Sequence, residues 1–162
     1  MDFVAIDFET AIGHHICSVG IVTFEGGKVI EEFHALIQPP DNNYNWHNIQ
    51  VHGITEEDTV NSPNFKGVYP DIEKRLKGRK VVAHNESFDR RVLSQTMSDF
   101  GIEYSTLDIP VKWECTLKIF KSKGYKPANL KACCDVHNIE LNHHEALSDA
   151  RACGQLYVIA NT

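Results

Sequence analysis

FVAIDFET, residues 3–10, is the stretch of sequence that decides the fold. Its first six residues are rich in apolar and β-branched side chains, a composition typical of a buried strand. Because side chains alternate along a strand, the carboxylates of Asp7 and Glu9 point to one face and Phe8 points to the other, where it fits a hydrophobic core. The sequence therefore predicts a strand that ends with two acids on the same face.

Two further apolar runs follow this strand. Residues 16–24 and 29–37 are predicted strands, and Glu25-Gly26-Gly27-Lys28 between them predicts a hairpin turn. The chain therefore begins with three antiparallel strands. Pro39-Pro40 ends the third one, and we expect the polar, aromatic stretch 41–52 to be a loop that is a candidate for a functional role.

The rest of the chain alternates segments of helical spacing with short strands. The expected elements are a short helix after Thr55, a helix at 65–76, a strand at 80–83, a helix capped by Ser87, a strand passing into a helix at 113–120, and helices at 129–137 and 145–159. This order predicts an α/β architecture, a mixed sheet of three antiparallel and then parallel strands with helices covering it, in a single domain over residues 1–162.

Composition excludes several classes of protein. The chain has 42% hydrophobic and 23% charged residues, which is typical of a globular domain. Its first ten residues lack the basic start and apolar stretch of a signal peptide, and no segment is long and apolar enough to span a bilayer. Five cysteines without CxxC spacing disfavour a disulfide framework or a cysteine zinc site and favour a reducing compartment. We expect a cytoplasmic protein.

Charge is unevenly distributed along the sequence. The formal net charge is −6, whereas phosphate contacts normally come from a basic surface. Six of the sixteen Lys and Arg residues nevertheless fall within residues 112–131. Each of these lysines alone is expected on a solvated helix face, but together they permit contact with a nucleic-acid backbone.

The paired acids Asp7 and Glu9 need compensation, because unpaired charges at the end of a buried strand repel each other and are costly. A divalent cation such as Mg²⁺ supplies it, and Mg²⁺ is bound by a few carboxylates together with water and substrate phosphate. Further acids are therefore expected from elsewhere in the chain. Asp89 follows another predicted strand at the start of a helix, and Asp149 lies on the last helix.

Four motifs in this order carry a resemblance to a known family. They are D-F-E-T at 7–10, V-H-G-I-T at 51–55, H-N-x-x-F-D at 84–89 and H-x-x-x-x-D-A at 144–150. The chain resembles the DEDDh superfamily of exonucleases, also called DnaQ-like, which includes the proofreading ε subunit of bacterial DNA polymerase III. The resemblance spans nearly the whole sequence.

The resemblance implies a ribonuclease H-like fold and a metal-dependent 3′ to 5′ exonuclease that releases 5′-mononucleotides. It implies that Asp7 bridges two ions, Mg²⁺ or Mn²⁺, and that Glu9, Asp89 and Asp149 complete their coordination. Two ions on either side of a phosphate can activate a water and stabilise the leaving oxygen.

A histidine is expected to act as the general base, because the unperturbed pKa of imidazole lies near neutrality. Spacing does not select it, since His84 precedes Asp89 by the same interval as His144 precedes Asp149. The resemblance assigns the role to His144. His84, at the end of an apolar strand, is then expected to be a structural histidine bonded to backbone, and His143 to be exposed to solvent.

The resemblance also implies a set of contacts to the terminal nucleotide. The expected residues are Thr10, His52, Asn85 and Phe88, although Phe88 also suits a core position. His14 and His15 follow the first motif and are expected to be exposed loop histidines.

The predicted substrate is the 3′ end of single-stranded DNA or of short RNA. An enzyme that trims RNA, similar to oligoribonuclease or RNase T, is an alternative. A non-catalytic binding module of the same fold is another, but such a module is expected to lose ligands, and all four acids and the histidine are present. The last predicted helix is followed by only a few residues, which favours a stand-alone enzyme, or one loosely associated with replication or repair proteins, over a resident proofreading subunit.

Overall fold

The computed structural model describes residues 1–162 and contains one five-stranded sheet with the strand order β3-β2-β1-β4-β5. The strands are β1 (Phe3–Ile12), β2 (His15–Glu25), β3 (Lys28–Leu36), β4 (Val81–Ala83) and β5 (Glu114–Cys115). β1, β2 and β3 pair antiparallel, whereas β4 is parallel to β1 and β5 is parallel to β4. The predicted mixed sheet is confirmed.

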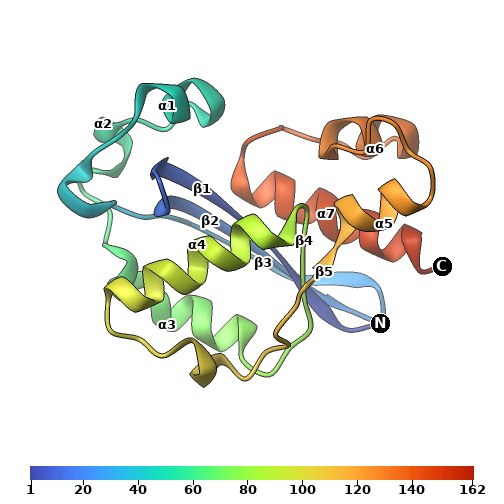
Figure 1. Ribbon diagram of the computed structural model, residues 1–162, viewed down its shortest axis with the longest axis horizontal. Coiled ribbons are helices and arrows are strands. Elements are labelled where there is room, and N and C mark those ends of the chain that lie inside the picture. Colours follow the sequence, from blue (N-terminus) through green and yellow to red (C-terminus); the bar gives the residue numbers. More distant parts are fainter.

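Seven α-helices surround the sheet. They are α1 (Trp46–His52), α2 (Glu56–Thr59), α3 (Phe65–Leu76), α4 (Glu86–Asp99), α5 (Thr116–Ser122), α6 (Leu130–His137) and α7 (Ala146–Ala160), and two 3-10 turns, η1 (Pro40–Asn42) and η2 (Tyr104–Leu107), accompany them. Helices α3 and α4 lie on one side of the sheet and α5, α6 and α7 on the other, while α1 and α2 lie beyond the end where β1 turns into β2 (Figure 1). None of the helices is long and apolar enough to cross a membrane.

Strand β1 separates two hydrophobic cores. Val4, Ile6 and Phe8 belong to the core beneath α3 and α4, and Phe3 and Ala5 belong to the core beneath α7. The strict alternation therefore extends along the strand as the sequence predicts. The acids that follow in the odd-numbered positions point to the α7 side of the sheet.

Helix α1 is a difference from the predicted loop at residues 41–52. The side chain of Asn45 accepts a hydrogen bond from the His47 backbone N–H at the start of the helix, and Gly53 ends it in the left-handed conformation at φ 75°. These are an ordinary N-cap and C-cap. The segment is helical because both of its ends are satisfied, although it is too short for a clear apolar periodicity.

The start of α4 also differs from the prediction. Ser87 was expected to cap this helix, but the helix begins at Glu86, and Asn85 precedes it in the left-handed conformation at φ 71° without a side-chain cap. Asparagine tolerates this conformation better than most residues. Asn85 is therefore the N-cap residue of α4, and its backbone conformation makes the tight turn from β4 without a side-chain hydrogen bond. Ser87 lies inside the first turn of the helix.

Two glycines let α7 approach the sheet closely. A Cβ atom on Gly20 would collide with the backbone of Ala146 and Leu147, and one on Gly154 would collide with the ring of Phe24. The Phe24 ring has little room to move, because it stacks on Phe3 with ring centroids 4.6 Å apart. The close approach fixes the N-terminal end of α7, which carries Asp149, against β1 and β2.

We expect Gly154→Ala to lower the free energy of unfolding by about 1–3 kcal/mol, because the added methyl group overpacks a core that cannot relax. Gly67→Ala is the matched control, since Gly67 also lies in a helix but the nearest atom to an added methyl there is the Pro63 Cβ at 3.1 Å. The control should change stability by less than about 1 kcal/mol. Urea denaturation measures both, and equal stability of the two variants contradicts the close-approach explanation.

Candidate active site

Four acids from three elements converge at the edge of β1. Carboxylate oxygens of Asp7 and Glu9 on β1 and of Asp149 on α7 all lie within 4.8 Å of one another. Asp89, in the first turn of α4, joins them because its Oδ1 accepts a hydrogen bond from the Phe8 backbone N–H at 3.0 Å. That amide lies between the two β1 acids. The structure therefore brings the four predicted metal ligands together.

A pocket of about 430 Å³ opens over these acids. Its walls come from β1, α1, α4, the start of α6 and the loop before α7. The residues that line it are Asp7, Phe8, Glu9, Thr10, Asn48, Val51, His52, His84, Phe88, Asn129, Leu130, His143, His144 and Asp149. Histidines and small polar groups make up much of this wall, and neither lysine nor arginine lines it.

The acids are unfavourable to each other as long as no cation is bound. Burial, followed by the charge of neighbouring acids, raises the pKa of Glu9 to about 8, and burial is also the main cause that raises the pKa of Asp89 to about 8. Burial raises the pKa of Asp7 well above its ordinary value, with the charges of Asp89, Glu9 and Asp149 adding to the shift. The pKa of Asp149 is raised as well, chiefly by burial.

The donor set fits a hard divalent cation. The Oδ2 atom of Asp7 is buried and makes no hydrogen bond, and the ion pairs of the structure give Asp7, Glu9 and Asp89 no Lys or Arg partner. A buried carboxylate oxygen without a partner is costly. Carboxylate oxygens with open positions for water and phosphate are what Mg²⁺ and Mn²⁺ prefer. The residues present therefore fit the predicted metal ions.

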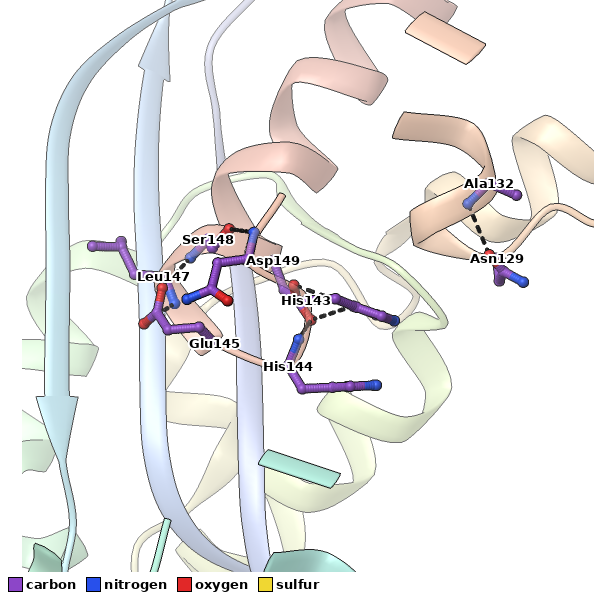
Figure 2. Close-up of polar contacts among 9 residues, drawn as sticks. Asn129, Ala132, His143, His144, Glu145, Leu147, Ser148 and Asp149 are labelled. Atoms are coloured by element: carbon purple, nitrogen blue, oxygen red, sulfur yellow. Dashed lines mark hydrogen bonds and ion pairs between the residues drawn. The ribbon is translucent and has the colours of Figure 1, made fainter. Parts of the chain in front are cut away.

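Asp149 is held by the loop that precedes α7. His143 Nδ1 lies 3.2 Å from Asp149 Oδ2, and the His144 backbone N–H donates to the same oxygen at 3.0 Å (Figure 2). Glu145 caps the helix by accepting a hydrogen bond from the Ser148 backbone N–H at 2.8 Å. His143 is exposed to solvent, as expected, but its contact with this acid gives it a place in the site that the sequence did not predict.

His144 adopts a strained backbone conformation, with φ at 67°. A non-glycine residue in this region costs energy that surrounding contacts must offset, and such residues gather at functional sites. Its ring stacks on that of His143 with centroids 3.7 Å apart, and both rings project to the same side of the loop (Figure 2). Burial, then the nearby His143 and His52, lower the pKa of His144, which favours the neutral imidazole that can accept a proton.

His84 also lines the pocket, but in a different environment. Its Nδ1 lies 2.9 Å from the Oγ1 of Thr116, while its Nε2 is buried and makes no hydrogen bond. The expected structural histidine thus bonds a side-chain hydroxyl, and an interaction with the Ala128 backbone also acts on its pKa. Burial lowers the pKa of His84 to about 4, so it is a weaker proton acceptor at neutral pH than an ordinary histidine.

Helix α1 supports Thr10 at the end of β1. Asn48 Nδ2 donates to the Thr10 backbone oxygen at 2.9 Å and contacts its hydroxyl at 3.1 Å. His52 accepts from the Ile54 backbone N–H on Nδ1 and therefore donates from Nε2 to the Thr10 oxygen at 2.9 Å. His52 lines the pocket, but both of its ring nitrogens are engaged within the protein, so neither is free to bond a nucleotide.

The remaining predicted substrate contacts divide between the pocket and the surface. Phe88 is half-buried, lines the pocket and also packs against the core beneath α4. Its position is thus compatible with both a nucleotide contact and a core role. Asn85 is exposed and does not line the pocket. Asn48 and Asn129 line it without having been predicted. Asn48 lies in the stretch that was expected to carry function, whereas nothing in the sequence distinguishes Asn129 from a helix cap.

Comparison with known proteins identifies the family of the chain. Residues 4–157 match the family model RNase_T, described as Exonuclease. The chain is 30% identical over 164 residues to DNA polymerase III PolC-type of Thermotoga maritima, an alignment that covers 96% of this chain and 12% of that protein. It is 27% identical over 150 residues to DNA polymerase III subunit epsilon of Haemophilus influenzae, covering 91% of this chain and 59% of that subunit.

A solved structure shows the same fold. Exonuclease X in complex with 5′ overhanging duplex DNA superimposes with a TM-score of 0.75 at 26% identity, covering 97% of this chain and 89% of that one. The match to the family model extends over nearly all of the sequence and includes every element that carries one of the four acids. The chain therefore belongs to the exonuclease family, with the ribonuclease H-like fold and the DEDDh motifs of its hydrolytic 3′ to 5′ members.

Proposed function

We propose that this chain hydrolyses phosphodiester bonds from the 3′ end of single-stranded DNA or short RNA and releases 5′-mononucleotides. One observation carries the proposal. Asp7, Glu9 and Asp149 meet in one pocket, Asp89 lies beside them on the Phe8 backbone N–H, and a buried Asp7 oxygen has no partner. A structural cluster of this kind without a basic residue has no evident stabilising role in the fold, whereas divalent cations convert it into a binding site for phosphate.

Asp7, Glu9, Asp89 and Asp149 would hold the Mg²⁺ or Mn²⁺ ions, for which we propose a number of two. Bound divalent cations supply Lewis-acid stabilisation of the charge that develops on the phosphate during hydrolysis. The protein contributes the fixed position of each ligand. The Phe8 backbone N–H orients Asp89, and His143 together with the His144 backbone N–H orients Asp149.

His144 acts as the general base that takes a proton from the attacking water. Its lowered pKa keeps the ring neutral at physiological pH, and its ring lines the same pocket as the acids. The strained loop and the stacked His143 ring hold it there. His84 is a weaker candidate, because its pKa of about 4 makes it a poor proton acceptor.

The terminal nucleotide enters between α1 and the start of α6. Val51, Phe88 and Leu130 provide the apolar wall of the pocket, against which a base or sugar can pack. Thr10 and its supporting Asn48 lie where the end of the strand would meet the protein. Asn85, being exposed, contacts the strand only outside the pocket.

The basic segment after Trp113 suits the strand that leads into the site. Lys118 pairs with Glu86 and Lys131 pairs with Asp135, but the salt bridges of the structure include no partner for Lys121. An unpaired lysine in this segment can contact phosphate, and such contacts weaken as salt concentration rises. The complex of exonuclease X with DNA supports a DNA 3′ end as the first substrate to test. RNA trimming is the alternative.

The setting of the enzyme is also part of the proposal. The chain spans 12% of the PolC-type relative and 59% of the epsilon subunit, so the activity and partners of those whole proteins are not transferred to it. We propose a single exonuclease domain that acts in the cytoplasm, with loose association to replication or repair proteins.

Asp7→Asn should abolish nucleotide release, because it removes the charge that would be shared between two cations. End-labelled single-stranded DNA and RNA of equal sequence are incubated with Mg²⁺, Mn²⁺ or chelator, and released mononucleotides are measured. We expect a loss of at least about 10³-fold, the scale on which removing a metal-based electrostatic contribution acts.

The matched control is Asp71→Asn. Asp71 and Glu73 have the same spacing as the β1 acids but lie on the surface of α3, where Asp71 pairs with Lys74. This variant should keep full activity. Metal-independent release, or equal activity of Asp7→Asn and Asp71→Asn, contradicts the proposed chemistry.

His144→Ala should lower kcat by about 10²–10⁴-fold, the usual contribution of a general base, with a smaller change in KM. His84→Ala should lower kcat by less than about tenfold, since a histidine with a pKa of about 4 is a weak base. Steady-state kinetics and circular dichroism separate a catalytic loss from misfolding. A larger kcat loss in a folded His84→Ala protein reverses the assignment.

Stability without divalent cations should fall as pH rises from 6.5 to 8. The pKa values of Glu9 and Asp89 rise from ordinary values of 4.5 and 3.8 to about 8 on folding, so ionising them opposes the folded state throughout that interval. The pKa of His84 falls from 6.5 to about 4 on folding, so its effect on stability lies mainly below pH 6.5, outside the measured interval. The melting temperature in chelator measures the effect.

Mg²⁺ or Mn²⁺ should raise the melting temperature more at pH 8 than at pH 6.5, because the ligands must be deprotonated to bind. Asp7→Asn should show a smaller pH dependence and a smaller metal effect than the unsubstituted protein. A cation effect that is equal at the two pH values is the contrary outcome.

A further inference from the structure

A second group of metal-binding side chains lies at the tip of the β1–β2 hairpin. His14 and His15 follow Gly13, which turns the chain with φ at 56°, and Asp99 is the last residue of α4. One ring nitrogen of each histidine and one carboxylate oxygen of Asp99 lie within 4.8 Å of one another. None of these residues lines the pocket over the four acids.

The two histidines differ from the exposed loop residues that the sequence led us to expect. Both are partly buried, and His15 is the first residue of β2. The burial arises because the end of α4 packs beside the hairpin tip. The contact brings Asp99 to the histidines although 85 residues of sequence separate it from His14.

The three side chains are already close to a coordinating arrangement. His14 Nε2 lies 2.6 Å from Asp99 Oδ2, and the His14 and His15 rings are 5.0 Å apart at an angle of 79°. The Nδ1 atom of His15 is buried and makes no hydrogen bond. The group thus contains an imidazole nitrogen whose hydrogen-bonding capacity is unused although it is shielded from water.

The backbone beneath this group is fixed by a separate contact. The hydroxyl of Thr96, one turn before the end of α4, lies 3.0 Å from the His14 backbone oxygen and 2.7 Å from the Val92 backbone oxygen, so its single proton is shared between the hairpin and the helix. The hairpin tip and the helix end are therefore held together without help from the side chains above them. Ligands on such a frame need little ordering when an ion binds.

We propose that His14, His15 and Asp99 form a binding site for a transition-metal ion of the Zn²⁺ class. Imidazole nitrogen together with carboxylate oxygen is a ligand set that suits Zn²⁺, whereas Mg²⁺ prefers oxygen ligands alone. Three protein ligands leave a fourth, tetrahedral position for water. The hard-cation site of four acids and this site therefore differ in the ion that they select.

The fit requires side-chain movement, and the best defined part concerns His14 and Asp99. Metal–ligand distances of about 2.0–2.2 Å in a tetrahedral site separate neighbouring ligand atoms by roughly 3.3–3.6 Å. His14 and Asp99 must move apart by about 1 Å from their present hydrogen bond to reach that separation. The Asp99 side chain is 49% exposed and stands at a helix end, so it has room to do so.

An ion at this position would connect the β1–β2 hairpin tip to the end of α4. β1 bears Asp7 and Glu9, and α4 bears Asp89 at the opposite end from Asp99. The helix between Asp89 and Asp99 extends about 15 Å along its axis. The ion would thus act as a structural cross-link between hairpin and helix and would take no part in the hydrolysis.

The experiment must separate this site from His143, His144 and Asp149, which also lie close enough together to hold an ion. The starting protein is therefore the full chain with His143→Ala and Asp149→Ala, stripped of metal with chelator. Zn²⁺ affinity is measured by competition with a chromogenic chelator, and the visible absorption of bound Co²⁺ reports nitrogen ligation in tetrahedral geometry.

We expect the starting protein to bind one Zn²⁺ and to show the Co²⁺ spectrum. His14→Ala and, separately, Asp99→Asn in that protein should each weaken Zn²⁺ binding at least about tenfold and remove the spectrum. His47→Ala, which removes an exposed histidine of α1 outside the group, is the matched control and should change neither. Circular dichroism in chelator verifies that each variant is folded.

Two results overturn the proposal. One is a folded starting protein that binds no Zn²⁺. The other is an affinity that stays the same in His14→Ala, Asp99→Asn and the control. Neither readout uses nuclease activity, so this inference and the proposed function can fail independently.

Discussion

The burial of four neighbouring carboxylates beside one strand is the constraint on which the rest of the structure depends. Burial raises the pKa values of Asp7, Glu9, Asp89 and Asp149, and the charges of neighbouring acids add to the shift. Holding them together requires strong packing from both sides of the sheet. Gly20 and Gly154 allow α7 to pack closely on the sheet and hold Asp149 in place. The hydrogen bond from the Phe8 backbone N–H holds Asp89 in place.

Much of this arrangement could be predicted from local rules. The alternation of β1 places its two acids on one face and Phe8 in the core, and the order of elements gives the mixed sheet. The convergence of Asp89 and Asp149 on that face was expected only from the resemblance to a family. Their positions depend on how α4 and α7 pack across the sheet, and no short-range pattern in the sequence determines the orientation of a helix on a sheet.

What could not be predicted depends on contacts between distant segments or on ends of elements. Helix α1 is stabilised by the Asn45 cap and by Gly53, which are weak signals in a helix of seven residues. The N-cap of α4 is Asn85 in the left-handed conformation, whereas the sequence favoured the serine that lies two positions later. His143 approaches Asp149 only because its loop folds back over the first turn of α7, and spacing alone did not separate its role from that of a surface histidine.

The distribution of the acids along the chain has a consequence for synthesis. Asp7 and Glu9 emerge first from the ribosome, and Asp149 emerges only with α7, after every strand of the sheet. A nascent chain that lacks this helix already has every strand of the sheet and carries Asp7, Glu9 and Asp89, but it lacks Asp149 and the helix that positions it. The cluster of four acids therefore becomes complete only after α7 has been synthesised, which makes its assembly one of the last events in the folding of residues 1–162.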